Sequence, residues 1–222
     1  MFVNSDFSRR AVVTPGQYHW VASPQSGVHR IMLDRVGGEV ARATSIVRYA
    51  QGSHFPRHQH PGGEEILVLS GTFSDEDGNY PAGWYLRNPP GSSHSPSSAP
   101  GATIFVKLYQ MSADERKAVR VDTRDPANWS KNCSRAICDL FCDGVERAVL
   151  EKISAAELLL SEVPQGAELL VLEGELLSAE GVYSQGSWLR MPPGDAGELR
   201  AGPAGATVYL KTGHLQSMVQ PS

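Results

Sequence analysis

Short apolar runs alternate with turn-forming segments along most of the chain. The runs include ILVL at 66–69, TIFVKL at 103–108, LLVL at 169–172 and TVYLKT at 207–212, and the segments around them include DEDGN, YPAG, NPPG and SAPG. Short apolar runs bounded by Gly, Pro, Asn and Asp are typical of β-strands joined by tight turns. Many short strands without alternating helices predict an all-β sandwich or barrel rather than a βαβ fold.

The second half of the chain repeats the first. The segment GGEEILVLSGTFSDEDGNYPAGWYLRNPPG, which starts at Gly62, aligns without gaps with QGAELLVLEGELLSAEGVYSQGSWLRMPPG, which starts at Gln165, at a constant offset of 103 residues. The identical positions include many turn residues: Gly71, Gly78, Tyr80, Gly83, Arg87, Pro89, Pro90 and Gly91 fall on Gly174, Gly181, Tyr183, Gly186, Arg190, Pro192, Pro193 and Gly194. A duplicated unit of this size predicts two similar domains in tandem.

The repeat also predicts where the domains begin and end. We expect a first domain over residues 1–111, which includes a lead-in of 28 residues with few strand signals. The polar segment 112–132 is interrupted by Pro126 and reads as the connection, with a short helical turn. The second domain is then expected over residues 133–222.

Four of the seven histidines, His54, His58, His60 and His94, lie between residues 54 and 94, and three of them have the spacing of metal ligands. His58 and His60 are two residues apart, so on a strand both imidazoles face the same side. A tight turn follows, and Glu64 then opens an apolar strand, which can bring its carboxylate back beside the histidines. His94 follows the turn at 89–91 and can complete a set of three nitrogens and one oxygen. Such a set suits Zn, Fe, Mn, Ni or Co.

The repeat is an internal control for this candidate site. At the same offset, His58, His60, Glu64 and His94 correspond to Ser161, Val163, Ala167 and Gly197, so all four candidate ligands are lost together. We therefore expect the second domain to hold no metal. Glu65 is kept as Glu168, which favours Glu64 as the ligand and a structural role for Glu65. Arg87 is kept as well, and we interpret it as a structural residue that pairs with a carboxylate.

Two spaced motifs connect these residues to a known family. Gly52-x5-His58-x-His60-x3-Glu64-x6-Gly71 fits the first cupin motif at every fixed position, and Gly83-x5-Pro89-x-Gly91-x2-His94 fits the second, with Ser98 in place of its terminal Asn. The sequence between about residues 20 and 110 resembles the cupin domain of ChrR-type anti-sigma factors. The resemblance implies two tandem cupin barrels, of the jelly-roll or double-stranded β-helix type, that form a bicupin. It also implies zinc on His58, His60, Glu64 and His94.

In that family a separate N-terminal helical domain, with its own zinc site, binds an extracytoplasmic-function sigma factor. The resemblance thus implies a sigma factor or another regulatory protein as the partner, although residues 1–28 contain no cysteine and are shorter than that domain. A small-molecule ligand fits the barrel, and the N-terminal strands would allow a homodimer.

Composition narrows the classes of function. Apolar residues make up 41% and charged residues 20% of the chain, which is typical of globular proteins. The formal net charge of −4 provides no broad basic field for nucleic-acid phosphates. No apolar run approaches the about 18 residues of a membrane-spanning helix, and the first residues lack the pattern of a secretory signal. We therefore expect a cytoplasmic protein without nucleic-acid or membrane partners.

The three cysteines, Cys133, Cys138 and Cys142, lie close together in the second half. An odd number without an export signal argues against a disulfide framework. On a regular strand, Cys138 and Cys142 would share a face with Leu140. We interpret the cysteines as buried thiols, because a zinc or redox site would need a paired CxxC or a nearby histidine.

Two functions are compatible with these observations. The first is a regulatory or sensing cupin with one divalent metal, zinc first and Fe, Mn or Ni as alternatives, which responds to reactive oxygen or organic oxidants as the resemblance implies. The second is a metal-dependent cupin oxygenase, such as a dioxygenase, or isomerase that acts on a small organic acid or diketone. The sequence offers no general base beyond the ligands, so it favours the first function and no catalytic residue is predicted.

Overall fold

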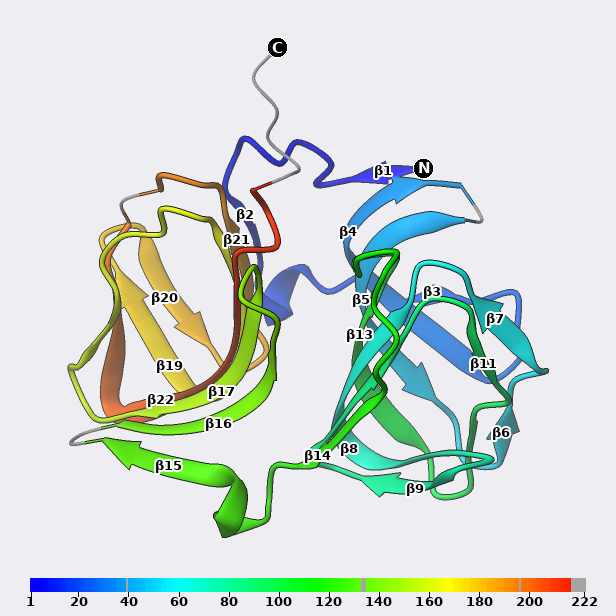
Figure 1. The fold of residues 1–222 in the computed structure, drawn as a ribbon. Coiled ribbons are helices and arrows are strands. Elements are labelled where there is room, and N and C mark those ends of the chain that lie inside the picture. The colour runs from blue at the N-terminus through cyan, green and yellow to red at the C-terminus, as the bar shows by residue number, and fades with distance from the viewer. Residues whose placement is uncertain (39, 133–134, 196, 217–222) are drawn as a thin grey trace. The chain divides into compact units, whose positions relative to one another are not determined.

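The computed structural model describes residues 1–38, 40–132, 135–195 and 197–216, and these residues form β-strands and turns (Figure 1). The helical elements in these ranges are two 3₁₀ turns, η1 (Pro15–Gln17) and η2 (Pro126–Asn128). The all-β prediction is confirmed. The chain divides into two compact units: residues 1–5 and 19–124 form the first, and residues 6–18 with the chain from Asp125 onward form the second.

The first unit combines one 11-stranded sheet with a two-stranded ribbon. In chain order its strands are β1 (Phe2–Val3), β3 (Val21–Ala22), β4 (Val28–Gly37), β5 (Ala41–Tyr49), β6 (Ser53–His54), β7 (His58–His60), β8 (Glu64–Asp75), β9 (Gly78–Pro81), β10 (Trp84–Asn88), β11 (Ser92–His94), β12 (Ser97–Ser98), β13 (Ala102–Leu108) and β14 (Val119–Asp122). The main path of hydrogen-bonded neighbours is β1-β4-β5-β13-β8-β10-β14, and β7 pairs with β11 in the ribbon.

The second unit is a 9-stranded sheet. Its strands are β2 (Ala11–Val13), β15 (Trp129–Asn132), β16 (Arg135–Cys142), β17 (Arg147–Ile153), β18 (Leu158–Leu160), β19 (Ala167–Ser178), β20 (Gly181–Ser184), β21 (Trp188–Met191) and β22 (Leu199–Thr212). The main path is β15-β16-β17-β22-β19-β21-β2. From β16 to β21 this order matches β4-β5-β13-β8-β10 of the first unit, so the sequence repeat is also a repeat of topology.

The units divide the chain differently from the sequence-based boundaries. Residues 6–18, expected in the first domain, belong to the second unit, where β2 pairs antiparallel with β21 (Figure 1). Residues 112–124, expected in the connection, belong to the first unit, where β14 pairs antiparallel with β10. The physical reason is the same in both cases. Strands β10 and β21 would otherwise end their sheets with unpaired backbone groups, and a short segment from outside each repeat covers that edge.

Each unit has its own apolar core. In the first unit Ile66, Val68, Leu86 and Ile104 are among the buried residues of one cluster. In the second unit the corresponding cluster includes Leu169, Val171, Leu189 and Val208. The first five residues of β8 and of β19 are all buried, and this explains why residues 66–68 and 169–171 within them form continuous apolar runs instead of alternating with polar residues.

A glycine that is kept in both repeats allows two strands to approach closely. Gly71 and Gly174 have φ angles of 71° and 70°, a left-handed conformation that side chains disfavour. A Cβ atom at Gly71 would overlap the carbonyl of Gly101, and one at Gly174 would overlap the carbonyl of Gly205. The repeated glycine is therefore required by the barrel.

The repeated arginine has the structural role that the sequence predicts. Arg87 is fully buried, and its Nη1 lies 3.0 Å from Oε2 of Glu65. Its Nε and Nη2 donate to the two carboxylate oxygens of Glu115 at 2.6 and 2.7 Å. In the second unit the buried Glu168 accepts a hydrogen bond from Trp188 Nε1 at 2.8 Å. Both repeated glutamates therefore lie in buried polar networks, away from the ligand positions.

The cysteines follow the prediction only in part. Cys138 is buried, as is Leu140, but Cys142 is exposed. The pairing of β16 with β17 shifts register between Asp139 and Phe141, and this bulge breaks the alternation on which a shared face depends. The expectation that Cys142 is a buried thiol is wrong. Cys133 lies outside the described residues.

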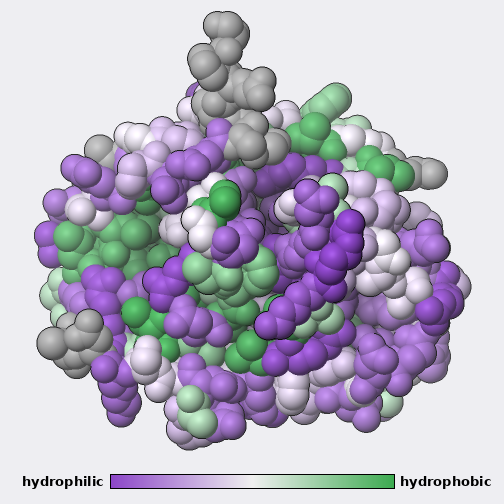
Figure 2. Space-filling view, viewed as in Figure 1, coloured by the Kyte–Doolittle hydropathy of each residue, from purple (hydrophilic) through white to green (hydrophobic). Residues whose placement is uncertain are grey.

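The visible surface carries mostly polar side chains, with an apolar area over the second unit at the left of the view (Figure 2). Within the described ranges, none of the helical elements has the length and apolar character needed to cross a bilayer.

Candidate metal centre

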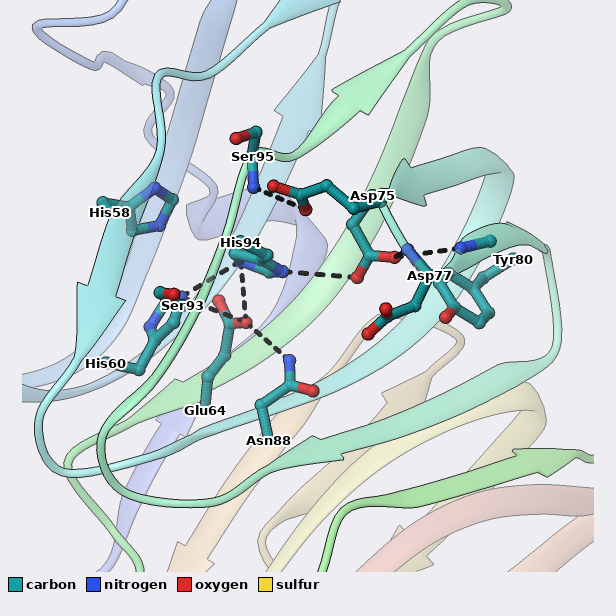
Figure 3. A network of polar contacts seen from close by, with 12 residues as sticks. His58, His60, Glu64, Asp75, Asp77, Tyr80, Asn88, Ser93, His94 and Ser95 are labelled. Carbon is teal, nitrogen blue, oxygen red and sulfur yellow. Dashed lines mark hydrogen bonds and ion pairs between the residues drawn. The ribbon is translucent and has the colours of Figure 1, made fainter.

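The ribbon of the first unit carries the three histidines. Strand β7 runs from His58 to His60, and strand β11 ends at His94. The two strands pair antiparallel with His94 opposite His58, so alternation along β7 brings both of its imidazoles to the face on which the His94 ring lies. Figure 3 shows the three rings directed toward one another.

The three imidazoles are close enough to share one ion. One ring nitrogen from each of His58, His60 and His94 lies within 4.8 Å of the other two. The Nε2 atoms of His60 and His94 are 3.0 Å apart, and the ring centroids of His58 lie 4.7 Å from His60 and 5.3 Å from His94. Three histidines in this arrangement could hold a metal ion.

The carboxylate of Glu64 lies beside the same group. Glu64 is the first residue of β8, directly after the turn that follows β7, and its side chain is buried. Its Oε2 is 3.3 Å from Nε2 of His94 and 3.5 Å from Nε2 of His60. The structure thus brings together all four residues that the sequence singled out. Glu65, the rejected alternative, points to the other side of the strand and pairs with Arg87.

Two of the rings are oriented by contacts to their far nitrogen. His58 Nδ1 lies 2.9 Å from the carbonyl oxygen of Pro56, and His94 Nδ1 lies 3.4 Å from Oδ2 of Asp75. When Nδ1 carries the proton that these oxygens accept, the Nε2 lone pair is left for a metal, a pattern common among metal-binding histidines. The candidate ligands and the groups that contact their far nitrogens therefore both suit a metal site.

Burial and charge act on two of the imidazoles in opposite directions. Burial lowers the pKa of His60, which favours the neutral ring that a metal requires. Burial also disfavours the charged form of His94, but the hydrogen bond to Asp75 and the charge of Glu64 outweigh it and raise the pKa of His94. Three such imidazoles at these distances would repel one another if protonated. When the rings are neutral, one cation could bind a nitrogen lone pair of each ring and offset the charge of Glu64.

Two supporting residues were not identified from the sequence. Asp75 lies behind His94, and Asn88 donates from Nδ2 to Oε2 of Glu64 at 3.1 Å. At the offset of the repeat, Asp75 corresponds to Ser178 and Asn88 to Met191. Both are replaced in the half that lacks the candidate ligands. The comparison of the two halves that distinguishes Glu64 from Glu65 therefore also distinguishes Asp75 and Asn88.

The remaining histidine of the region lies outside the site. His54 is exposed on β6, where its carbonyl oxygen accepts a hydrogen bond from Gln25. The interpretation of three histidine ligands rather than four therefore agrees with the fold.

The equivalent place in the second unit is apolar. Val163 and Ala167, which replace His60 and Glu64, are buried in the core cluster together with Met191. Ser161 is exposed, and a Cβ atom at Gly197 would overlap the guanidinium of Arg10. At the positions of His60 and Glu64 this part of the second unit therefore presents carbon atoms, and at the position of His94 it presents the guanidinium of Arg10.

Comparison with solved structures gives matches over nearly the whole chain at low identity. A candidate dioxygenase from Nostoc punctiforme superposes with a TM-score of 0.70 at 14% identity, over 97% of this chain and 83% of its own. The protein YlbA from Escherichia coli gives 0.70 at 16%, over 94% and 93%. The pirin YhhW from Escherichia coli, solved with nickel(II), gives 0.68 at 10%, over 92% and 98%. At these identities the likeness concerns the fold, and it supports a two-barrel architecture.

Sequence comparison is more specific for the first half. Curated protein sequences give no match to the chain. The model of the ChrR cupin-like domain matches residues 8–112, a range that contains all four candidate ligands and extends the resemblance seen in the sequence toward the N-terminus. The chain therefore has a two-barrel cupin fold, and its residues 8–112 match the ChrR cupin-like family.

Proposed function

We propose that the first unit binds one divalent metal ion through His58, His60, Glu64 and His94, and that the protein is a regulatory or sensing cupin. The observation that carries the proposal is the convergence of three histidine nitrogens within 4.8 Å beside the Glu64 carboxylate. The match to the ChrR cupin-like family supports the regulatory role and the response to reactive oxygen or organic oxidants. A sigma factor or another regulatory protein is then the expected partner, in the cytoplasm.

Zinc is the ion that we expect. Three imidazoles and one carboxylate make a complete tetrahedral set, and zinc readily accepts this geometry. Iron, manganese and nickel accept the same donors but take further ligands from water or a small molecule. The nickel(II) bound to the pirin of Escherichia coli, a structural neighbour, supports nickel as an alternative.

A metal analysis tests the site itself. The wild-type protein, purified without added metal, is expected to contain close to one equivalent of metal per chain. The double change His58→Ala with His60→Ala should remove it, while the second unit stays folded because its core contains neither residue. His54→Ala is the matched control, since His54 is an exposed histidine of the same region. Retention of near-stoichiometric metal by the double variant would refute the ligand assignment.

A second function has one observation in its favour. His58 is half-buried, whereas His60 and His94 are buried, so the ligand set reaches toward solvent on one side. This side would allow a small organic acid or diketone to reach a metal with open positions, as an oxygenase or isomerase needs. X-ray absorption of the purified protein separates the two functions. Four-coordinate zinc favours regulation, and an ion with exchangeable waters favours catalysis.

A further inference from the structure

A chain of two side chains connects the candidate ligand Glu64 to strand β14. Asn88 donates from Nδ2 to Oε2 of Glu64 at 3.1 Å, and Arg120 donates from Nη2 to Oδ1 of Asn88 at 2.8 Å. A guanidinium can only donate, so the Asn88 oxygen must face Arg120 and its NH₂ group must face the carboxylate. Glu64 and Asn88 are buried, and the orientation of each link is therefore fixed by the next. Figure 3 shows the Asn88–Glu64 end of this relay below the histidine rings.

The strand pairing delivers the three side chains to one face. Asn88 lies opposite Glu64 in the β10–β8 pair, and Leu86 lies opposite Arg120 in the β10–β14 pair. Leu86 points into the core of the first unit, so Asn88, two residues on, and Arg120 are placed on the same interior side.

The guanidinium is held in place by neutral groups. Arg120 Nη1 donates to the carbonyl oxygens of Val119 at 2.9 Å and Arg87 at 3.2 Å, and the group lies 5.6 Å from the ring centroid of Tyr80. None of these hydrogen-bond acceptors is a carboxylate among the described residues, and the charge of Arg120 also helps to lower the pKa of Asp75, the carboxylate behind His94.

Comparison with the second unit shows that the barrel fold does not itself require the residues of this relay. Met191 lies opposite Ala167 as Asn88 lies opposite Glu64, and Val12 of β2 lies opposite Leu189 as Arg120 lies opposite Leu86. The covering strand is thus present in both units, but the relay residues are absent from the unit that lacks the ligands. Asn88 is replaced within the repeat by Met191, whereas β14 and β2 both come from outside it, and β2 shows that a covering strand can pair without an arginine at this place.

We propose that Arg120 is a positioning residue for Glu64, acting through Asn88, and that it couples metal binding in the first unit to the attachment of β14. The inference rests on the proposed metal site. Strand β14 ends at Asp122, two residues before the first unit ends and the chain enters the second. Because coupling is reciprocal, an ion that fixes Glu64 stabilises β14, and loss of the Arg120 link weakens metal binding. The segment that leaves the first unit thereby responds to the state of its metal.

Metal affinity tests the positioning role. Arg120→Met keeps a long side chain and removes the donors, and it is expected to weaken zinc binding tenfold to a hundredfold, about the range for groups behind metal ligands. Asn88→Ala should cost about the same, and the double variant little more, because both break one relay. Arg120→Lys should restore part of the affinity. The matched control is Arg124→Met, since Arg124 is exposed in the same segment and pairs with Asp122. Competition with a chromophoric chelator measures each constant.

Hydrogen exchange tests the coupling first in the wild-type protein, where the result does not depend on the folding of a variant, and then in the Arg120→Met variant. Zinc is expected to slow exchange of the amides at 119–122 in the wild type and to leave them unchanged in the Arg120→Met variant. A wild type that binds neither zinc nor iron, manganese or nickel overturns the proposed function, and this inference with it. A wild type that binds zinc, with equal affinity in the Arg120→Met variant and no change in exchange at 119–122, overturns the inference alone.

Discussion

The guanidinium of Arg10 lies against Gly197, the residue that occupies the position of His94 in the second unit. Arg10 comes from the lead-in segment next to β2, and it forms a bidentate ion pair with Asp195, in which Nε donates to Oδ2 at 3.0 Å and Nη2 donates to Oδ1. The side chain of the lead-in thus uses space that a third histidine would need. At the position of His94 the second unit therefore has a half-buried arginine that anchors the segment next to β2, in place of an imidazole.

Gly197→Ala should therefore destabilise the second unit. The added Cβ would overlap Nη2 of Arg10 and force the guanidinium away from Asp195. We expect a loss of about 1.5–3 kcal/mol in the free energy of unfolding, the range for a hydrogen bond to a charged group. Denaturant unfolding measures it, and Arg10→Met should cost a similar amount. If the two losses simply add in the double variant, the overlap with Arg10 is not the cause.

The Arg10–Asp195 pair also predicts a pH dependence. Burial opposes ionisation of Asp195, but the hydrogen bonds from Arg10 and the amide of Gly197 outweigh it and lower its pKa. A lowered folded-state pKa contributes stability above the unfolded value of about 3.9 and loses it as the pH falls through the folded value. The stability difference between the wild type and Arg10→Met should be constant near neutral pH and shrink below about pH 4. A difference that stays the same from neutral pH to well below about pH 4 would contradict this origin.

Asp75→Asn should weaken metal binding without unfolding the first unit. The Oδ2 atom of Asp75 faces His94, while Oδ1 accepts from the amides of Asp77 and Gly78 and holds the turn. The amide side chain can keep the turn contacts through its oxygen but removes the negative charge behind His94. We expect a tenfold to hundredfold lower affinity, about the effect of other outer-shell changes.

Asp77→Asn is the matched control for this change, because Asp77 is exposed on the same turn. Chelator competition gives the affinities, and thermal unfolding with and without zinc checks the fold. Equal weakening in both variants would point to the turn, or to surface charge, rather than to the hydrogen bond with His94.

Much of the candidate site could be predicted because the two halves of the chain can be compared with each other. His58, His60, Glu64 and His94 were found from spacing on expected strands, and the repeat separated Glu64 from Glu65. Asp75 and Asn88 carried the same signal at the same offset. They were not predicted because neither residue has the spacing of a metal ligand; each contacts a candidate ligand from behind.

Arg120 could not be found in this way. Its counterpart Val12 precedes the repeat, whereas Arg120 follows it, so no constant offset connects them. The same exchange of edge strands explains the domain boundaries that the sequence misplaced. A strand of three or four residues is too short for its periodicity to predict the strand with which it pairs. The pairing of β14 and of β2 is determined by the edges of β10 and β21, which would otherwise be unpaired. The bulge in β16 that exposes Cys142 is likewise set by pairing with β17.

The two adjacent glutamates should respond in opposite ways to the same substitution. Glu64→Gln keeps the shape of the side chain and removes the charge next to His60 and His94, so metal affinity should fall at least tenfold with little loss of stability. Glu65→Gln removes one carboxylate from the buried Arg87 and leaves Glu115, so stability should fall by about 1–3 kcal/mol, less than for a fully broken buried pair.

Each of these two substitutions is the control for the other. Both substitutions neutralise one carboxylate on one strand, so an effect of net charge would appear equally in both. Metal content and the free energy of unfolding, measured on the same two variants, should therefore move separately. If Glu65→Gln loses the metal while Glu64→Gln keeps it, the ligand assignment is reversed. In that case the alternation of β8, which directs Glu64 to the histidines and Glu65 to Arg87, is not the arrangement in solution.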